Sequence, residues 1–294
     1  MERILLFGRN GQLGQEAKNS LSTVGEVYSY DHHEVDFLNL SQISSVIKSI
    51  NPSIIYNAVA YTNVDKAEEE RSNAHKINAI APGVIAEEAK KINAILIHFS
   101  TDYVFDGTTN IPYIESNPVN PINIYGQTKL AGENAVMAVG AMSFIFRTAW
   151  VYSIRKQSFV GKVLKWSRNL KTLRIVSDQI GSPTWARSLA EVSAKSISHA
   201  LKQGNDWIEE KSGLYHLAGK GAVSRLDWAK KIIEFDPNRD EQKVKEIIPA
   251  ASKEFPTLAD RPLYTALNIN KFRKTFDLEL NEWENALKSA LQST

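Results

Sequence analysis

The sequence predicts an α/β protein with a doubly wound parallel sheet and a second, smaller mixed α/β domain. In the first half, short and nearly continuous apolar runs alternate with amphipathic segments. Strands buried on both faces have this apolar character, and helices between them give a parallel sheet with right-handed crossovers. The alternation becomes less regular after Trp150, which predicts a second unit there.

Five strands and four helices are expected in the first half. In the third helix, Ile77, Ile80 and Val84 recur at helical spacing, so one of its sides should face the core. The predicted strands are Ile4–Phe7, Glu26–Tyr30, Ser53–Asn57, Ala94–Phe99 and Ser143–Arg147, and the predicted helices are Leu13–Leu21, Ser41–Ile50, Asn73–Ile92 and Tyr125–Val139.

The second half predicts fewer and more scattered elements. We expect helices at 185–201, 226–235 and 282–291 and a short strand at 214–217. Prolines at 237, 249, 256 and 262 should mark loops. The large domain is predicted to comprise residues 1–150 and about 185–220, and the smaller domain residues 151–184 and 221–294.

The composition excludes several classes of site and partner. The chain has 294 residues and no cysteine, so it has no disulfide, no thiolate nucleophile and no cysteine-ligated metal. A net charge of +2 does not favour nucleic acid or a membrane surface as a partner. Only four apolar residues precede Gly8, too few for a signal peptide or a membrane span. We therefore expect a cytoplasmic protein.

A glycine-rich turn follows the first predicted strand and opens the first predicted helix. Gly8, Gly11 and Gly14 have the spacing G-x-x-G-x-x-G. Glycines there let a phosphate approach the backbone, and the helix N-terminus offers free N–H groups to a pyrophosphate. The turn therefore predicts a dinucleotide-binding (Rossmann) domain.

Two residues near this turn point to different nicotinamide cofactors. Asp31, at the end of the second strand, is placed to hold a ribose hydroxyl and favours NAD. Arg9 could pair with a 2′-phosphate and favours NADP. The choice therefore stays open. Asp36 and Phe37 could contact the adenine, although a helix cap and a core phenylalanine are the simpler explanation of that pair by itself.

Tyr125 and Lys129 lie four residues apart on a predicted helix and so share a face. An ammonium near a phenol lowers the pKa of the phenol and lets it exchange a proton with a carbonyl or alcohol oxygen. Thr101 follows the fourth strand, at the edge where open parallel sheets bind ligands, and its hydroxyl could orient a reacting carbonyl. Taken alone, the Tyr125–Lys129 pair is explained by a chance Tyr-x-x-x-Lys sequence. The glycine turn, the hydroxyl after the fourth strand and the Tyr–Lys pair rarely occur together in this order by chance.

With these features the chain resembles the extended short-chain dehydrogenase/reductases, and more narrowly the dTDP-4-dehydrorhamnose reductase family. The resemblance spans nearly the whole chain. Its specific parts are residues 57–68 (NAVAYTNVDKAE) and 147–152 (RTAWVY). The turn at 8–14 and the segment YGQTKLAGE at 125–133 are shared across the superfamily.

The resemblance implies a role for individual residues. Tyr125 would donate a proton, Lys129 would lower its pKa and hold the cofactor ribose, and Thr101 would orient the carbonyl. Cofactor contacts would come from Gly8, Gly11, Gln12, Leu13, Gly14, Asp31, Asp36, Phe37, Ala60, Tyr61, Thr62, Tyr125 and Lys129. Substrate contacts would come from Thr62, Val64, Thr101, Asp102, Tyr125 and Trp150. For Trp150, a core aromatic at a domain hinge is the alternative.

The implied reaction is reduction of the C4 keto group of dTDP-4-dehydro-L-rhamnose to dTDP-L-rhamnose, with NADPH or NADH, in dTDP-rhamnose biosynthesis. One alternative is a nucleotide-sugar epimerase or dehydratase on the same fold. Another is a non-catalytic protein that resembles the regulatory subunit of methionine adenosyltransferase.

The resemblance also bears on metal and partners. Some family members pair around a divalent ion held by acids, and Glu16 matches the first acid, but Arg187 stands at the second. We therefore expect no metal site. We expect a monomer or a homodimer with a small-molecule nucleotide-sugar substrate and no nucleic-acid or membrane partner.

Overall fold

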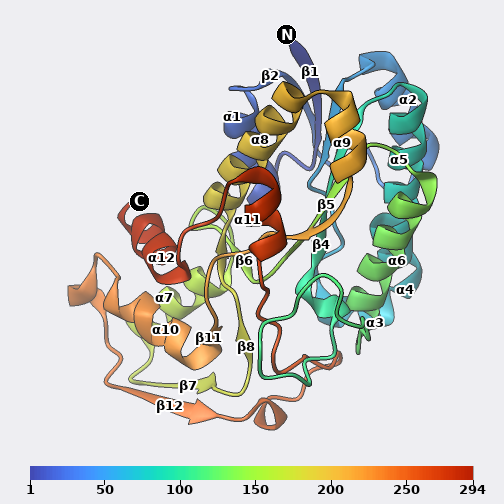
Figure 1. The fold of residues 1–294 in the computed structure, drawn as a ribbon. Helices are drawn as coiled ribbons and strands as arrows, with labels where there is room; N and C mark the ends of the chain where they lie inside the picture. Colours follow the sequence, from blue (N-terminus) through green and yellow to red (C-terminus); the bar gives the residue numbers. More distant parts are fainter. Residues whose placement is uncertain (294) are drawn as a thin grey trace.

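The computed structural model describes residues 1–293, and a six-stranded parallel sheet lies at its centre (Figure 1). The order β2-β1-β3-β4-β5-β10 changes direction between β1 and β3, the point where doubly wound sheets bind ligands. The predicted doubly wound sheet is confirmed. The strands are β1 (Glu2–Phe7), β2 (Gly25–Tyr30), β3 (Ile54–Asn57), β4 (Ile95–Thr101), β5 (Ser143–Thr148) and β10 (Gly213–His216).

Helices cover both faces of this sheet (Figure 1). Helices α1 (Gln12–Leu21) and α8 (Ala186–Gln203) pack together on one face. Helices α2 (Leu40–Ile50), α5 (Ala81–Lys91) and α6 (Ile124–Val139) cover the other. Neighbouring residues of β1 enter different cores, Leu6 on the first face and Leu5 on the second. The apolar runs are continuous because both sides of each strand are buried.

The helix predicted over residues 73–92 has three parts. It begins as α4 (Arg71–His75), continues as the π-helical segment η1 (Lys76–Ile80) and ends as α5. A short helix, α3 (Val64–Glu69), precedes it. π-Helical turns inside α-helices often occur at functional sites.

The second half of the chain adds a smaller unit with its own core, at the lower left of Figure 1. Trp228 and Leu287 lie in this core. Its elements are α7 (Phe159–Asn169), α10 (Arg225–Glu234), α12 (Trp283–Gln292) and the paired strands β7 (Thr172–Val176) and β12 (Glu246–Ala250). Shorter pairs are β6 (Val151–Tyr152) with β9 (Thr184–Trp185) and β8 (Ile180–Gly181) with β11 (Val223–Ser224).

Several elements of the second half differ from the sequence-based expectation, and two of them bear on the domain prediction and on a predicted loop. The predicted loop at Pro249 is wrong, because Pro249 lies in β12 opposite Ile175, on a strand whose other side is unpaired and can therefore accept a residue without an N–H. Helix α11 (Asn270–Phe276) was not predicted, and it brings Phe272 and Phe276 into the core of the large sheet although 221–294 was expected in the smaller domain. The division into domains itself stays a prediction.

The other short helices are α9 (Asn205–Lys211), η2 (Asp102–Val104), η3 (Arg239–Glu241) and η4 (Ser252–Glu254).

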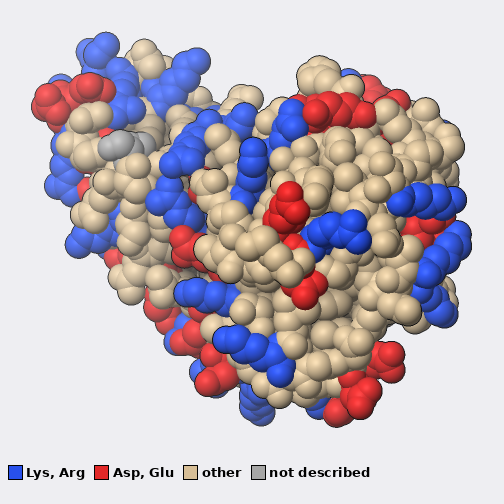
Figure 2. Space-filling model, turned by 90° about the horizontal axis from the view of Figure 1, so that it is seen from above, with Lys and Arg blue, Asp and Glu red and all other residues tan. Residues whose placement is uncertain are grey.

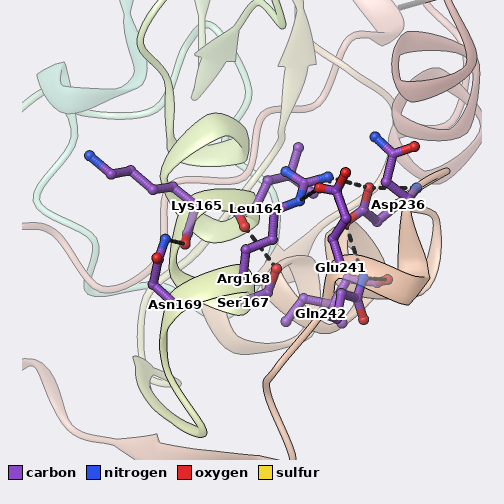
Figure 3. Close-up of polar contacts among 10 residues, drawn as sticks. Leu164, Lys165, Ser167, Arg168, Asn169, Asp236, Glu241 and Gln242 are labelled. Atoms are coloured by element: carbon purple, nitrogen blue, oxygen red, sulfur yellow. Dashed lines mark hydrogen bonds and ion pairs between the residues drawn. The ribbon is translucent and has the colours of Figure 1, made fainter.

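Arg168 joins the end of α7 to the segment after α10 (Figure 3). Its guanidinium donates to the carboxylate of Asp236 at 3.0 Å and pairs with Glu241 at 2.6 Å. The side chain of Gln242 donates to the same Asp236 carboxylate at 3.2 Å. These contacts give Arg168 a structural role.

The surface carries both signs of charge. Figure 2 shows acidic and basic side chains interspersed over one face, in keeping with 35 Lys and Arg against 33 Asp and Glu. Within residues 1–293, no helix combines the length and the apolar character that a membrane span requires.

Candidate active site

The glycine turn brings the start of α1 close to the end of β1. Gly8 has a φ of 88°, a conformation that other residues rarely adopt. A Cβ atom at Gly14 would lie 2.0 Å from the carbonyl oxygen of Gly8, so only glycine permits this approach. Gly11 caps α1 and offers no side chain to the first N–H groups of the helix. The turn therefore forms the cradle that a pyrophosphate requires.

Two adjoining cavities run along the carboxyl edge of the sheet, and most of the predicted site residues line them. Gly14 and Val64 line neither, since Gly14 packs behind the turn and Val64 begins α3. Predicted residues around the first cavity, of about 390 Å³, are Gly8, Gly11, Asp31, Asp36, Phe37, Ala60 and Tyr61. Those around the second, of about 570 Å³, are Gly11, Gln12, Leu13, Ala60, Thr62, Thr101, Asp102, Tyr125, Lys129 and Trp150.

Asp31 and Arg9, which favour different cofactors, are joined in one ion pair. Asp31 is buried and accepts hydrogen bonds from the side chain of Asn10 at 2.5 Å and of Arg9 at 3.3 Å. The hydrogen bond from the His33 N–H, together with the charge of Arg9, holds the pKa of Asp31 below its usual value. Arg9 also pairs with Glu34 at 3.0 Å. The cation is therefore already shared between two carboxylates.

Asp36 and Phe37 have local structural partners. Phe37 is buried and meets the ring of Phe7 edge-on, with the ring centroids 5.3 Å apart. Asp36 accepts a hydrogen bond from the N–H of Leu38 at 2.8 Å. These contacts fit the structural explanation of Asp36 and Phe37. Both residues also form part of the wall of the first cavity.

Thr101, Tyr125 and Lys129 meet where β4 ends and α6 begins. The side chain of Asn123 caps α6 by accepting from the N–H of Gly126 at 2.8 Å. Lys129 is buried and donates to the carbonyl oxygen of Phe99 at 2.6 Å. Thr101 donates to the carboxylate of Asp102 at 3.0 Å. The helix and the strand end are thus held together at the three predicted catalytic positions.

In the chain alone, burial dominates the pKa of Tyr125, and the lowering of this pKa by Lys129 stays a prediction. Burial raises the pKa of Tyr125, and the hydrogen bond with Thr101 opposes this only in part. Burial also raises the pKa of Asp102 to about 6. The ammonium of Lys129 is engaged by the carbonyl of Phe99 instead. Tyr125 is therefore protonated at neutral pH, which is the state a proton donor needs.

A pH profile should report the charge of Lys129. Burial lowers the pKa of Lys129 to about 8, with the carboxylate of Glu133 acting in the opposite direction. The ammonium form is present below this pKa and is lost above it. We expect kcat/KM for carbonyl reduction to fall as the pH rises through about 8. Rates measured from pH 6 to pH 10 check this, and a flat profile over that range would contradict a required ammonium.

Asn78, which the sequence analysis missed, fixes the loop after β3. The side chain of Asn78 is fully buried and accepts from the N–H of Tyr61 at 2.8 Å. It donates to the carbonyl oxygen of Tyr61 and to the hydroxyl of Thr128, both at 3.1 Å. A Cβ atom at Gly132 would lie 2.1 Å from the carbonyl oxygen of Asn78, so this glycine lets α6 pack on the π-helical segment.

A buried ion pair lies directly behind the end of β4. Arg147 donates to both oxygens of the Glu133 carboxylate, at 2.8 and 2.6 Å, and both side chains are buried. The hydroxyl of Ser100 also donates to Glu133. Bidentate arginine–carboxylate pairs have a fixed geometry, so this pair holds α6, β4 and β5 together next to Thr101.

Trp150 has contacts that fit both explanations of its role. It lines the larger cavity and also stacks on Trp228, with ring centroids 5.5 Å apart. Its φ is 44°, a strained value for a residue with a bulky side chain. A Cβ atom at Gly181 would lie 2.5 Å from the Trp150 ring, so a glycine there makes room for the indole.

Glu16, the acid that the resemblance relates to a metal, is paired with cations. Its carboxylate lies 3.3 Å from Arg187 and 3.8 Å from Arg155. Among residues 1–293, no group of three or more His, Asp or Glu side chains is arranged to hold a metal.

Comparison with known proteins gives consistent similarities. A family model described as the RmlD substrate binding domain matches residues 1–294. The dTDP-4-dehydrorhamnose reductase of Salmonella typhimurium is 38% identical over 295 residues, covering 98% of this chain and 96% of that protein. The crystal structure of dTDP-4-dehydrorhamnose reductase from Bacillus anthracis in complex with NADP has a TM-score of 0.90 and 34% identity, covering 100% of this chain and 99% of the other. A UDP-glucose 4-epimerase from Thermus thermophilus, in complex with NAD, has a TM-score of 0.79 at 15% identity, a likeness of fold alone.

Proposed function

Because this chain belongs to the dTDP-4-dehydrorhamnose reductase family, we propose that it reduces the C4 keto group of dTDP-4-dehydro-L-rhamnose to dTDP-L-rhamnose. The observation that carries the proposal is that Thr101, Tyr125 and Lys129 share one cavity with the glycine cradle. A proton donor and a dinucleotide cradle in one cavity fit carbonyl reduction.

The residues at the sheet edge fit NADPH, which supplies the hydride when bound. Gly8 and Gly11, with the open N-terminus of α1, would hold the pyrophosphate. A Cβ atom at Gly14 would clash with the carbonyl oxygen of Gly8 and disrupt the turn. This requirement for glycine supports the placement of the pyrophosphate. Asp31 would accept from a ribose hydroxyl, and Lys129 would donate to the other ribose. NADH is proposed as the alternative cofactor.

The chain's own residues would supply the proton. Tyr125 is protonated at neutral pH because it is buried, and it would donate this proton to the C4 oxygen. Thr101 would orient the carbonyl by a hydrogen bond, and the ammonium of Lys129 would stabilise the phenolate that remains. Thr62, Asp102 and Trp150, which line the same cavity, would contact the sugar.

A coupled assay tests the proposed reaction. We expect one NADPH to be consumed for each dTDP-4-dehydro-L-rhamnose converted, with dTDP-L-rhamnose as the product. An epimerase retains its nicotinamide through the cycle, so conversion without net loss of NADPH would identify that alternative. A non-catalytic protein would leave both compounds unchanged.

The cofactor preference should depend on Asp31. The carboxylate of Asp31 already pairs with Arg9, and the 2′-phosphate of NADPH would bring further negative charge close to it. We expect Asp31→Asn to shift the kcat/KM ratio toward NADPH by about tenfold, roughly 1.4 kcal/mol. Asp206→Asn serves as the control, because Asp206 is exposed on α9 and lines neither cavity. An unchanged ratio in Asp31→Asn would contradict the placement of the adenosine half beside Asp31.

A further inference from the structure

Asn123 uses both ends of its side-chain amide, and only one of them serves its own helix. The amide oxygen accepts from the N–H of Gly126 at 2.8 Å and caps α6. The amide nitrogen donates to the carbonyl oxygen of Asp260, also at 2.8 Å. Asn123 is buried, and a buried amide engaged at both ends has a fixed orientation. The start of α6, just before Tyr125, is therefore tied to a segment far away in the sequence.

The segment 259–265, which receives this hydrogen bond, is attached to the smaller unit. The N–H of Ile180 in β8 donates to the carbonyl oxygen of Leu263 at 2.7 Å. The N–H of Thr265 donates to the carbonyl oxygen of Ile180 at 2.8 Å. Strand β8 pairs with β11, which leads into α10. The segment 259–265 thus bonds to the smaller unit on one side and to α6 on the other.

The same segment also reaches the end of β4. Thr265 is buried, and its hydroxyl donates to the carboxylate of Asp102 at 2.5 Å. That carboxylate accepts from the hydroxyl of Thr101 at 3.0 Å. One segment therefore contacts the supports of both Thr101 and Tyr125, the two residues proposed to act on the sugar carbonyl.

An ion pair fixes the segment 259–265 against α3. Arg261 pairs with the carboxylate of Asp65 at 2.7 Å, and the N–H of Ala259 donates to the same carboxylate at 3.1 Å. Helix α3 in turn contributes Glu68, whose carboxylate accepts from the N–H of Ile124 at 2.8 Å. The segment thus supports the first turn of α6 directly through Asn123 and indirectly through α3.

We infer that Asn123 is a positioning residue, through which the smaller unit sets the place of the proton donor Tyr125. The inference rests on the proposed function, because that function gives Tyr125 its role. Proton transfer needs the donor within hydrogen-bond reach of the carbonyl oxygen. A misplacement of about 1 Å can cost a hundredfold in rate, so the bond to Asp260 should affect turnover more than cofactor binding.

Asn123→Asp breaks the bond to the segment and keeps the helix cap. Aspartate caps a helix about as well as asparagine, but it has no N–H to donate to the carbonyl of Asp260. We expect kcat for reduction of the ketosugar to fall at least about tenfold, while the Kd of NADPH changes less than about twofold. Steady-state rates, a fluorescence titration of NADPH and thermal unfolding provide the measurements, with rates taken well below the unfolding temperature. A merely structural role would lower that temperature and leave kcat of the folded enzyme unchanged.

The control is Asn39→Asp, the same exchange at another N-cap. Asn39 caps α2 by accepting from the N–H of Gln42 at 3.3 Å, and it is exposed. Within residues 1–293 its amide nitrogen donates to no other group, so the exchange removes no hydrogen bond. Its kcat should stay within about twofold of the wild type.

Equal kcat in Asn123→Asp, Asn39→Asp and the wild type would overturn the inference. A Kd for NADPH that rises as much as kcat falls would overturn it too, since the whole site would then be distorted. If Asn123→Asp does not fold, Arg261→Met decides, because it loosens the segment and leaves Asn123 intact. We expect its kcat to fall at least about threefold, and an unchanged kcat there would overturn the inference. Failure of the wild-type protein to reduce the ketosugar would instead contradict the proposed function.

Discussion

Replacing Tyr125 with phenylalanine is expected to lower kcat at least about a hundredfold, because it removes the proton donor and little else. Tyr125 lines the larger cavity, of about 570 Å³, together with Thr101 and Lys129, and its hydroxyl is the only part that the substitution deletes. The affinity for NADPH should change little, since the glycine cradle and Asp31 are untouched. Steady-state rates together with a fluorescence titration of NADPH provide the measurement.

The matched control for this prediction is Tyr28→Phe. Tyr28 lies within β2, away from both cavities, and loses the same hydroxyl. Its turnover should stay near that of the wild type. Near-normal turnover in Tyr125→Phe would be incompatible with the proposed proton donor.

Replacing Glu133 with alanine is expected to cause the largest loss of stability. The change leaves Arg147 buried without its carboxylate and removes the acceptor of the Ser100 hydroxyl. Breaking one side of a buried ion pair costs about 3–5 kcal/mol. Urea unfolding at neutral pH should show a loss of this size in the free energy of unfolding. Activity should fall as well, because Glu133 and Ser100 hold the strand end that carries Thr101.

A double variant separates the ion pair from packing. In Glu133→Ala with Arg147→Met, no buried charge remains unpaired, so part of the stability should return. The Arg147 guanidinium also lies 5.1 Å from the centroid of the Phe105 ring, and that contact is not recovered. A double variant as unstable as the sum of both single variants would show that the two side chains do not act as a pair.

Much of the fold was predictable because the central strands are buried on both faces. The run at Ile4–Phe7 is apolar throughout, the run at Ala94–Phe99 is apolar except for His98, and the structure places both in the sheet. In the second half the strands are short, and β7 and β12 include exposed residues. Thr172–Val176, for example, alternates exposed and buried residues and carries no continuous apolar run. Pro249 predicted a loop because proline has no backbone N–H to donate to a neighbouring strand. An edge strand accepts a proline because one of its sides needs no such donor.

The candidate site was predictable where a motif fixes the backbone. The glycine turn and the Tyr125–Lys129 spacing place residues through local geometry, and the structure brings them to one edge of the sheet. The residues that contact the site residues from other elements were not predictable, because they come from distant parts of the chain. Asn78 is placed by a π-helical segment, and Arg225 meets Trp150 only through the packing of the smaller unit. The pKa of Tyr125 depends on burial, which a sequence does not show.

The central claim is that a hydride from the nicotinamide and a proton from Tyr125 reach the same sugar carbonyl. NADPH that carries deuterium at the transferred position tests it most directly, with dTDP-4-dehydro-L-rhamnose as the substrate. We predict one deuterium at C4 of dTDP-L-rhamnose for each NADPH consumed, and almost no labelled product with Tyr125→Phe. An unlabelled product, or label at another carbon of the sugar, would contradict the claim.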